Sequence, residues 1–89
     1  MEIVCKDFRR DVQNTRKGYF TLSLAGVEIR KCVLHKHPGG SIWFSPPAVQ
    51  VDHGGKSGWE AVVAVPDESL KQRIRDAVTA QLGAAVKND

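Results

Sequence analysis

The sequence predicts an α+β domain: a curved antiparallel β-sheet meander of about five strands, followed by one C-terminal amphipathic helix. Two observations lead to this prediction. Up to residue 65, apolar side chains recur with the two-residue period of strands and are interrupted by turn residues. After Pro66 the period lengthens to about 3.6, as in a helix whose apolar stripe covers a sheet face. A chain of 89 residues builds one core, so we assign residues 1–83 to a single domain and 84–89 to a frayed tail.

The first two strands are predicted from charge and from alternation. Ile3–Asp11 is an extended, highly charged segment, and turn chemistry follows it at Asn14–Gly18. In "YFTLSLAG" (19–26) one face carries Phe and Leu side chains and the other carries Tyr, Thr and Ser, which indicates a half-buried strand. Ala25-Gly26 then allows a tight turn into an antiparallel partner.

The third strand, "VEIRKCVLH" (27–35), changes its apolar face halfway. Its first two apolar side chains, at 27 and 29, have the opposite parity to Cys32 and Leu34. A β-bulge at Arg30-Lys31 brings both pairs into one core and curls the sheet. The alternative is a strand whose halves serve two cores, one of them shared with a second subunit. Both interpretations leave Arg30 and Lys31 at an exposed kink.

The chain from 36 to 65 supplies two further predicted strands and the segment that connects them. Ser41–Ser45 is a short strand that starts after a Pro-Gly-Gly turn and stops at Pro46-Pro47. Residues 48–58, with three glycines near their end, indicate either a flexible loop or the arm of a long hairpin. Trp59–Val65 is apolar on both parities, which predicts a central strand covered on each side.

The C-terminal helix begins after Asp67, a suitable N-cap. One stripe of the helix is apolar and faces the sheet, and it consists of Leu70, Ile74, Ala77, Val78 and Leu82. The other side carries Lys71, Arg73 and Arg75. We therefore expect about four helical turns with a cationic exposed side.

No pattern of catalytic or cofactor-binding residues stands out. Cys5 and Cys32 are not spaced as a metal or redox motif, and we expect two buried thiols. His35 and His37 share a strand face, with His53 as a third candidate metal ligand, yet histidines beside a Pro-Gly-Gly turn are usually solvated. We expect no enzyme, cofactor, metal or small-molecule substrate. Since no apolar run suits a signal peptide or a bilayer span, we also expect a cytoplasmic protein without a membrane partner.

Basic residues form the only recurrent functional pattern. The chain has 13 Lys/Arg against 10 Asp/Glu, a net charge of +3, and residues 1–36 hold eight of the basic residues against four acids. Cations from separate elements can line up along nucleic-acid phosphates. The candidates are Arg9, Arg10, Arg30, Lys31, Lys71, Arg73 and Arg75. The competing interpretation is surface charge scattered for solubility.

The order of several short motifs resembles the stage V sporulation protein G (SpoVG) family of bacterial septation regulators. The motifs are Arg9-Arg10 in the first strand, "VEIRKCVL" with its change of face, "SIWFSPP" where the family has an aromatic and apolar run ending in Pro-Ser, and "KQRIRDAV" in the helix. The resemblance covers nearly the whole chain. It implies a small homodimer, a curved sheet with a C-terminal helix, that binds DNA or RNA and influences gene expression.

The resemblance also implies which residues contact nucleic acid. The family's basic residues at the start of the helix match Lys71 and Arg73, and Arg75 is an additional cation here. The family's Lys-Arg pair after Pro-Ser is replaced by Val49-Gln50. This departure leaves a second hypothesis open, a protein interaction module in which apolar loop residues, with Trp43 or Trp59, dock a partner protein.

Overall fold

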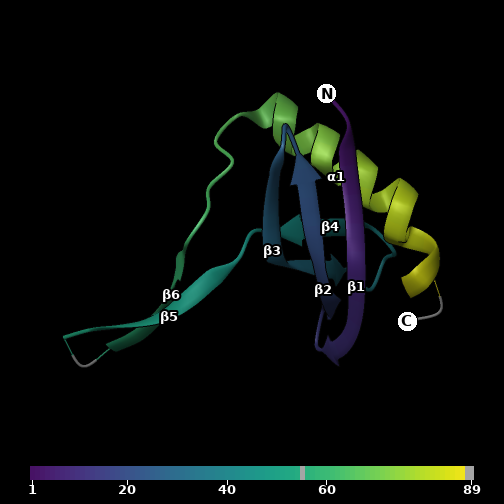
Figure 1. The fold of residues 1–89 in the computed structure, drawn as a ribbon. Helices are drawn as coiled ribbons and strands as arrows, with labels where there is room; N and C mark the ends of the chain where they lie inside the picture. Colours follow the sequence, from purple (N-terminus) through teal and green to yellow (C-terminus); the bar gives the residue numbers. More distant parts are fainter. Residues whose placement is uncertain (55, 88–89) are drawn as a thin grey trace.

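The computed structural model describes residues 1–54 and 56–87 of the chain and has the predicted α+β architecture (Figure 1). The elements in chain order are β1 (Ile3–Gln13), β2 (Arg16–Leu24), β3 (Val27–Lys36), β4 (Ile42–Ser45), β5 (Ala48–His53), β6 (Lys56–Ala61), α1 (Glu68–Leu82) and a 3₁₀ helix (Gly83–Val86). Strands β1 to β4 form one antiparallel sheet in sequential order, and β5 and β6 form a separate two-stranded sheet. Among the described residues, no helix is long and apolar enough to cross a bilayer.

The bulge predicted in β3 is confirmed. Phe20 of β2 pairs with Cys32 of β3, whereas Leu22 pairs with Ile29, so two β3 residues face one residue of β2. The extra residue is accommodated at Lys31, whose backbone has φ 61°. Ile29 packs against the same core as Cys32, while Val27 at the start of the strand stays exposed. The change of parity therefore serves a single core.

A second bulge, in β1, turns an aromatic ring inward. Between Lys6 and Arg9 the register with β2 shifts, and Asp7 has φ 56°. Phe8 beyond it packs against the core. Its ring lies so close over Gly18 that a Cβ built there would be 2.7 Å from the ring edge. Gly18 is thus the residue that lets Phe8 fold over β2.

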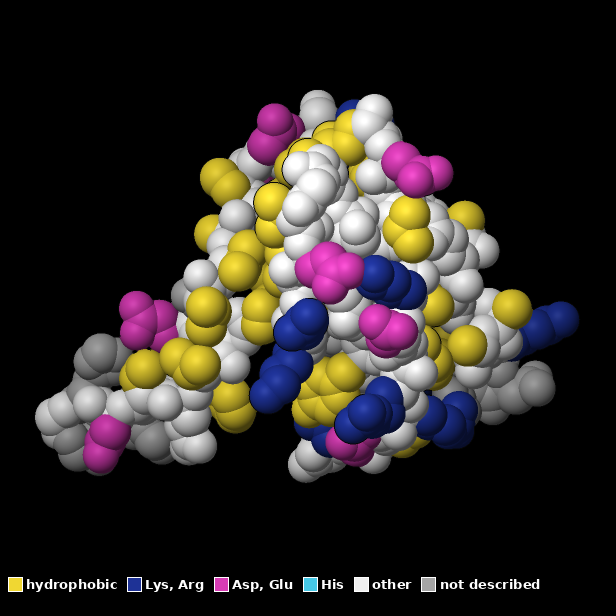
Figure 2. Space-filling model, in the orientation of Figure 1, with side chains coloured by type: hydrophobic (Ala, Val, Ile, Leu, Met, Phe, Trp, Pro, Cys, Tyr) yellow, Lys and Arg dark blue, Asp and Glu magenta, His cyan; other side chains and the backbone are white. Residues whose placement is uncertain are grey.

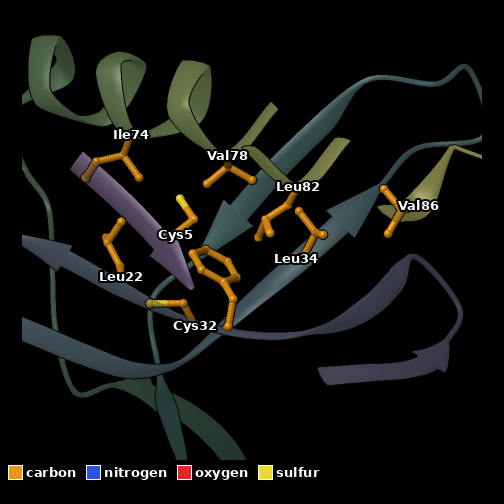
Figure 3. Packing of buried hydrophobic residues seen from close by; sticks show 9 residues of the cluster. Cys5, Leu22, Cys32, Leu34, Ile74, Val78, Leu82 and Val86 are labelled. Atoms are coloured by element: carbon orange, nitrogen blue, oxygen red, sulfur yellow. The ribbon is translucent and has the colours of Figure 1, made fainter. Parts of the chain in front are cut away.

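Helix α1 closes the curled sheet and completes the core (Figure 3). Its N-terminus is capped as expected, since Asp67 accepts a hydrogen bond from the Leu70 N–H (3.1 Å). The buried side of the helix faces side chains from β1, β2 and β3. The core consists of Cys5, Phe20, Leu22, Cys32, Leu34, Ile74, Val78, Leu82 and Val86.

Side chains of α1 bind both edges of the four-stranded sheet. On the β1 edge, the Gln81 amide accepts from the Cys5 N–H (2.7 Å) and donates to the Ile3 carbonyl (2.8 Å), as a neighbouring strand would. On the β4 edge, Arg75 Nε donates to the Ile42 carbonyl (2.9 Å). The helix therefore lies across the opening between the first and last strands, and its position relative to both is fixed.

Residues 84–87 are structured, although a frayed tail was expected from 84 to 89, and residues 88 and 89 lie outside the described part of the chain. Ala84–Val86 belong to the 3₁₀ helix, and the Val86 side chain is fully buried. Lys36 of β3 donates to the carbonyls of Val86 (2.8 Å) and Lys87 (3.0 Å). Apolar burial and a cation at the carbonyl end of the helix together hold this segment.

Strands β5 and β6 form the hairpin arm that was one of the two expected alternatives, and the arm projects from the body (Figure 1). The central strand predicted at Trp59–Val65 is wrong. Within the described chain, β6 ends at Ala61 and pairs with β5, and Trp59 is 74% exposed. A continuous apolar run does not distinguish a doubly covered strand from a connecting segment. Here the second half of the run, at 62–66, leads back to the helix, and Val65 packs on the core.

Both cysteines are free and buried, as predicted. Burial raises the pKa of each thiol, Cys5 and Cys32, to about 11. Both therefore stay protonated near neutral pH and behave as small apolar side chains in the core.

Candidate nucleic-acid interface

The face of the sheet opposite α1, here called the outer face, carries polar and aromatic side chains in direct cross-strand register. One row crosses all four strands, with Gln13 opposite Arg16, Arg16 opposite His35 and His35 opposite Trp43. Residues paired in this way project on the same side of a sheet. This row lies outside because its β3 member follows the buried Leu34.

Three rings meet at the end of this row. The Trp43 indole stacks on the His35 imidazole, with centroids 4.8 Å apart and planes at 9°, and on the His37 imidazole, at 3.4 Å and 24°. Thr15 Oγ1 lies 3.2 Å from His35 Nδ1 and fixes that ring. We call Trp43, His35 and His37 the ring cluster. Its outermost member, His37, is exposed.

The pKa of His35 is lowered from its usual range. Burial is the largest cause, and the neighbouring His37 and Arg16 add smaller electrostatic contributions in the same direction. The neutral imidazole is therefore favoured at the centre of the row. It is well suited to stack on an indole without the cost of a buried charge.

Arg16 is held in a fixed orientation on the outer face. Its guanidinium lies over the Tyr19 ring, 5.1 Å from the centroid. It donates to the backbone carbonyl and the carboxylate of Asp11, both at 3.1 Å, and to Gln13 at 3.0 Å. Arg9 pairs with Tyr19 across β1 and β2, so it projects on the same face. Planar cations and aromatic rings thus alternate across three strands.

A groove of about 180 Å³ runs between β4 and α1, and we call it the β4 groove. Its helix wall contains Lys71 and Arg75, which are one helical turn apart and so lie on one flank. Lys71 also forms an ion pair with Glu68 (3.2 Å). The sheet wall is formed by Trp43 and Phe44. Trp43 therefore belongs to both the ring cluster and the groove, and it joins the outer face to the helix cations.

The third predicted helix cation lies elsewhere. Arg73 is on the opposite flank of α1, where its guanidinium donates to the Met1 carbonyl (3.3 Å). Residues two apart on a helix project about 200° from each other, so Arg73 cannot share a flank with Lys71 and Arg75. The three cations expected on one exposed side of the helix are therefore divided between two flanks, with Lys71 and Arg75 on one and Arg73 on the other.

The predicted strand cations are spread over the sheet. Arg30 at the bulge is exposed and lies 3.7 Å from Glu28, which also pairs with Lys6. The hydrogen bond from Lys6 is the main cause that lowers the pKa of the Glu28 carboxyl. Lys31 is exposed beside Arg30. Figure 2 shows this mixture, with basic and acidic side chains interleaved over the sheet side of the molecule.

Arg9 and Arg10 project on opposite sides of β1. Arg9 is on the outer face, whereas Arg10 pairs with Gly18, whose strand position faces inward with Phe20. The seven predicted cations therefore do not form one surface within a single chain. The structure brings Lys71 and Arg75 together beside Trp43, and it places Arg9 and Arg30 at separate points of the sheet.

The other candidates from the sequence are the possible metal ligands and the loop residues Val49 and Gln50. In the described part of the chain, no group of three His, Cys, Asp or Glu residues is arranged to hold a metal ion. The side chain of His53 lies outside the described part. Val49 and Gln50, at which the SpoVG resemblance expects a Lys-Arg pair, are in β5 of the arm. No protein-family model, curated protein or solved structure matches this chain.

Sequence reasoning did not find the ring cluster. The available signal was the alternation of His35 and His37 on one strand face, followed by Trp43 after a short turn. What makes the cluster is the register of β3 with β4, which pairs His35 with Trp43. That register depends on where the turn at 38–41 closes, with the His37 N–H donating to the Ser41 carbonyl (2.9 Å).

Proposed function

We propose that this protein is a non-enzymatic regulator that binds DNA or RNA along the β4 edge. The observation that carries the proposal is the β4 groove, in which Lys71 and Arg75 lie beside Trp43, the central member of the ring cluster. Cations supply sequence-independent attraction to phosphates, and rings supply stacking surfaces for bases. Regulation of gene expression in the cytoplasm is the use that the SpoVG resemblance implies.

Other cations extend the proposed path of the ligand. From the β4 groove, the outer-face row leads through His35 to Arg16, and Arg9 lies in the next row. Arg30 and Lys31 at the bulge are exposed at the far end of the same sheet. In the proposal, these residues determine how far the interface extends, and Lys71 and Arg75 lie at its centre.

A matched pair of arginines tests the proposal. Arg75 and Arg73 are on one helix, and each donates to a backbone carbonyl, Arg75 to that of Ile42 in β4 and Arg73 to that of Met1 before β1, but of the two only Arg75 lines the β4 groove. We expect Arg75→Gln, alone and combined with Lys71→Gln, to weaken binding of short labelled DNA and RNA by about tenfold at low salt. The slope of log affinity against log salt should fall by about 0.7–0.9 for each lost phosphate contact.

The matched variant Arg73→Gln removes the same charge from the other flank and should leave affinity nearly unchanged. Fluorescence anisotropy titrations of single-stranded and duplex probes measure all three variants. Equal losses for Arg73→Gln and Arg75→Gln would mean that only net charge matters, and the proposed site would be abandoned.

The arm supports a second candidate function. In it, the protein is an interaction module whose partner is a second copy of this chain. Trp59 of β6 and Val62, which follows it, are exposed large apolar residues at 74% and 61%. Beside the root of the arm lies an apolar groove of about 390 Å³, lined by Phe44, Pro46, the segment 63–66 and Lys71. The exposed acids Asp52 and Glu60 on the arm complement Lys71 at this groove.

In this second proposal, each arm of a homodimer occupies the apolar groove of its partner. Sedimentation velocity of the wild-type chain should give the mass of a dimer. Glu60→Lys and Lys71→Glu should each weaken the dimer, and their combination should restore it, because the opposite charges are exchanged. A monomer at high protein concentration would exclude the arm as a self-association device.

A further inference from the structure

The ring cluster restricts which form of nucleic acid can use the site. Bases in a duplex are stacked on both faces at a spacing of about 3.4 Å, so their faces are covered except at the ends. A protein ring can stack only on a base whose face is free, as in a single strand, a loop or a bulge. Cations alone bind either form, and the rings distinguish between them.

The distance between the rings on the outer face also limits which nucleic acid can bind. Its ring cluster is in the row of His35, and Tyr19 is in the next row, that of Val33. Neighbouring rows on one sheet face are about 7 Å apart, and Tyr19 and Trp43 are also separated laterally by two strands. Two bases bound at these rings are therefore much farther apart than stacked neighbours. Only an extended, unstacked strand meets both.

The rings are held ready for such a ligand. Thr15 fixes His35, the backbone bonds of the turn at 38–41 hold His37 beside Trp43, and Asp11 with Gln13 holds Arg16 against Tyr19. His37 is exposed, and Trp43 is half-buried and lines the β4 groove with Lys71 and Arg75. Trp43 therefore lies between the exposed His37 ring, on which it stacks, and the two cations.

We infer that the β4 edge takes single-stranded nucleic acid, with one unpaired base stacked on the ring cluster and an adjoining phosphate held by Lys71 and Arg75. The inference rests on the proposed function and names its ligand class. The rings of the ring cluster, and not only the charges of Lys71 and Arg75, determine the affinity for a single strand. Duplexes of the same sequence bind more weakly because they cannot offer an open base face.

The two tryptophans allow a direct test. In a Trp59→Phe background, Trp43 is the single tryptophan of the chain, so its fluorescence reports the site. Titration at low salt with an unlabelled oligo(dT) or oligo(U) strand of about 12 nucleotides should change this fluorescence, and a mixed-sequence duplex of equal length should not. In the wild-type chain, the single strand should bind at least tenfold more tightly than the duplex.

Substitutions separate stacking from charge. Trp43→Leu and the milder His37→Ala, which keeps the backbone bonds of the turn, should each weaken single-strand binding, by about tenfold for Trp43→Leu. Neither change should alter the salt slope, because neither removes a phosphate contact. The control is Trp59→Leu, the same substitution on the exposed arm, which should bind like the wild type. Circular dichroism melting checks that each variant is folded.

The outcomes distinguish the single-strand inference from the proposed binding of DNA or RNA by the cations. Single-strand preference with a Trp43 response and losses at Trp43 and His37 supports the inference. Equal duplex affinity, with no effect of Trp43→Leu or His37→Ala, overturns the inference and leaves the cation site standing. Absence of binding to any probe at low salt overturns the proposed function and the inference with it. Equal losses for Trp43→Leu and Trp59→Leu also overturn stacking at the ring cluster.

Discussion

The body of this protein and its arm use apolar side chains in opposite ways. In the body, a curled sheet and one helix bury nine core residues, and Leu34, Val78 and Val86 have no exposed surface. In the arm, β5 and β6 pair with each other and leave Val49 and Trp59 exposed. The two-stranded arm therefore contributes little to folding, since an isolated hairpin is marginally stable in water. The core does not use the arm's exposed apolar residues Val49 and Trp59.

Truncation of one large apolar side chain in each region should give the largest difference between the body and the arm. Leu34→Ala should lower the free energy of unfolding by about 2–5 kcal/mol, because it leaves a cavity in a closed core. Trp59→Ala on the arm should change it by no more than about 0.5 kcal/mol in dilute monomer. Urea denaturation followed by circular dichroism measures both. Similar losses would show that the arm packs on the body.

Two glycines in strands provide a second contrast. A Cβ at Gly18 meets the Arg9 carbonyl and the Phe8 ring, whereas a Cβ at Gly58 in β6 meets nothing within 4 Å. We expect Gly18→Ala to destabilise the fold by about 1–3 kcal/mol through overpacking. Gly58→Ala should be near neutral. Thermal melting of both variants checks the prediction, and an unaffected Gly18→Ala would mean that Phe8 can move away at no cost.

Two glutamines of α1 differ in whether they connect the helix to the sheet. Gln81→Ala removes both hydrogen bonds to the β1 backbone and should cost about 1 kcal/mol or slightly more. Gln72, whose amide bonds the exposed Asp76 on the same helix, is the matched control, and Gln72→Ala should cost a few tenths. Hydrogen exchange at the Cys5 amide should accelerate in Gln81→Ala alone. Unchanged exchange would show that the β1 edge is protected by other means.

The smallest expected effect is a dependence of stability on pH at His35. Its folded-state pKa is lowered, so the unfolded chain takes up protons first as pH falls below about 6.5. Stability is therefore fully present above the unfolded pKa and declines as pH falls toward the lowered folded value. Urea midpoints at about pH 8 and pH 5 should differ less in His35→Gln than in the wild type. An identical difference would assign the pH dependence to other groups.

The body could be predicted from the sequence further than the arm because its signals are local. The alternation of Phe20 and Leu22, the stripe of Ile74 and Val78, and the parity change before Cys32 each specify one element and its buried side. The arm failed at Trp59–Val65, where an apolar run is compatible with two structures. Only long-range packing distinguishes a central strand from an exposed one.

The sequence indicated which residue types form the candidate site, but it indicated less well how these residues lie relative to one another. We predicted Lys71, Arg73 and Arg75 on one exposed side of the helix. Helical spacing already separates Arg73 from the other two by about 200°, but it does not say which flank meets the sheet. Trp43 joins this flank to the outer face through the register of β3 and β4. That register follows from how a turn closes, and a single sequence does not specify it.

The contact of Gln81 with β1 has a consequence for how this protein avoids aggregation. A bare outer strand offers its N–H and C=O groups to any extended chain, and such edges seed intermolecular sheets. Here one amide side chain occupies those groups at Ile3 and Cys5. Partial detachment of the C-terminal helix would uncover them before the core is lost, so the onset of fibre formation in this protein should follow the loosening of its helix.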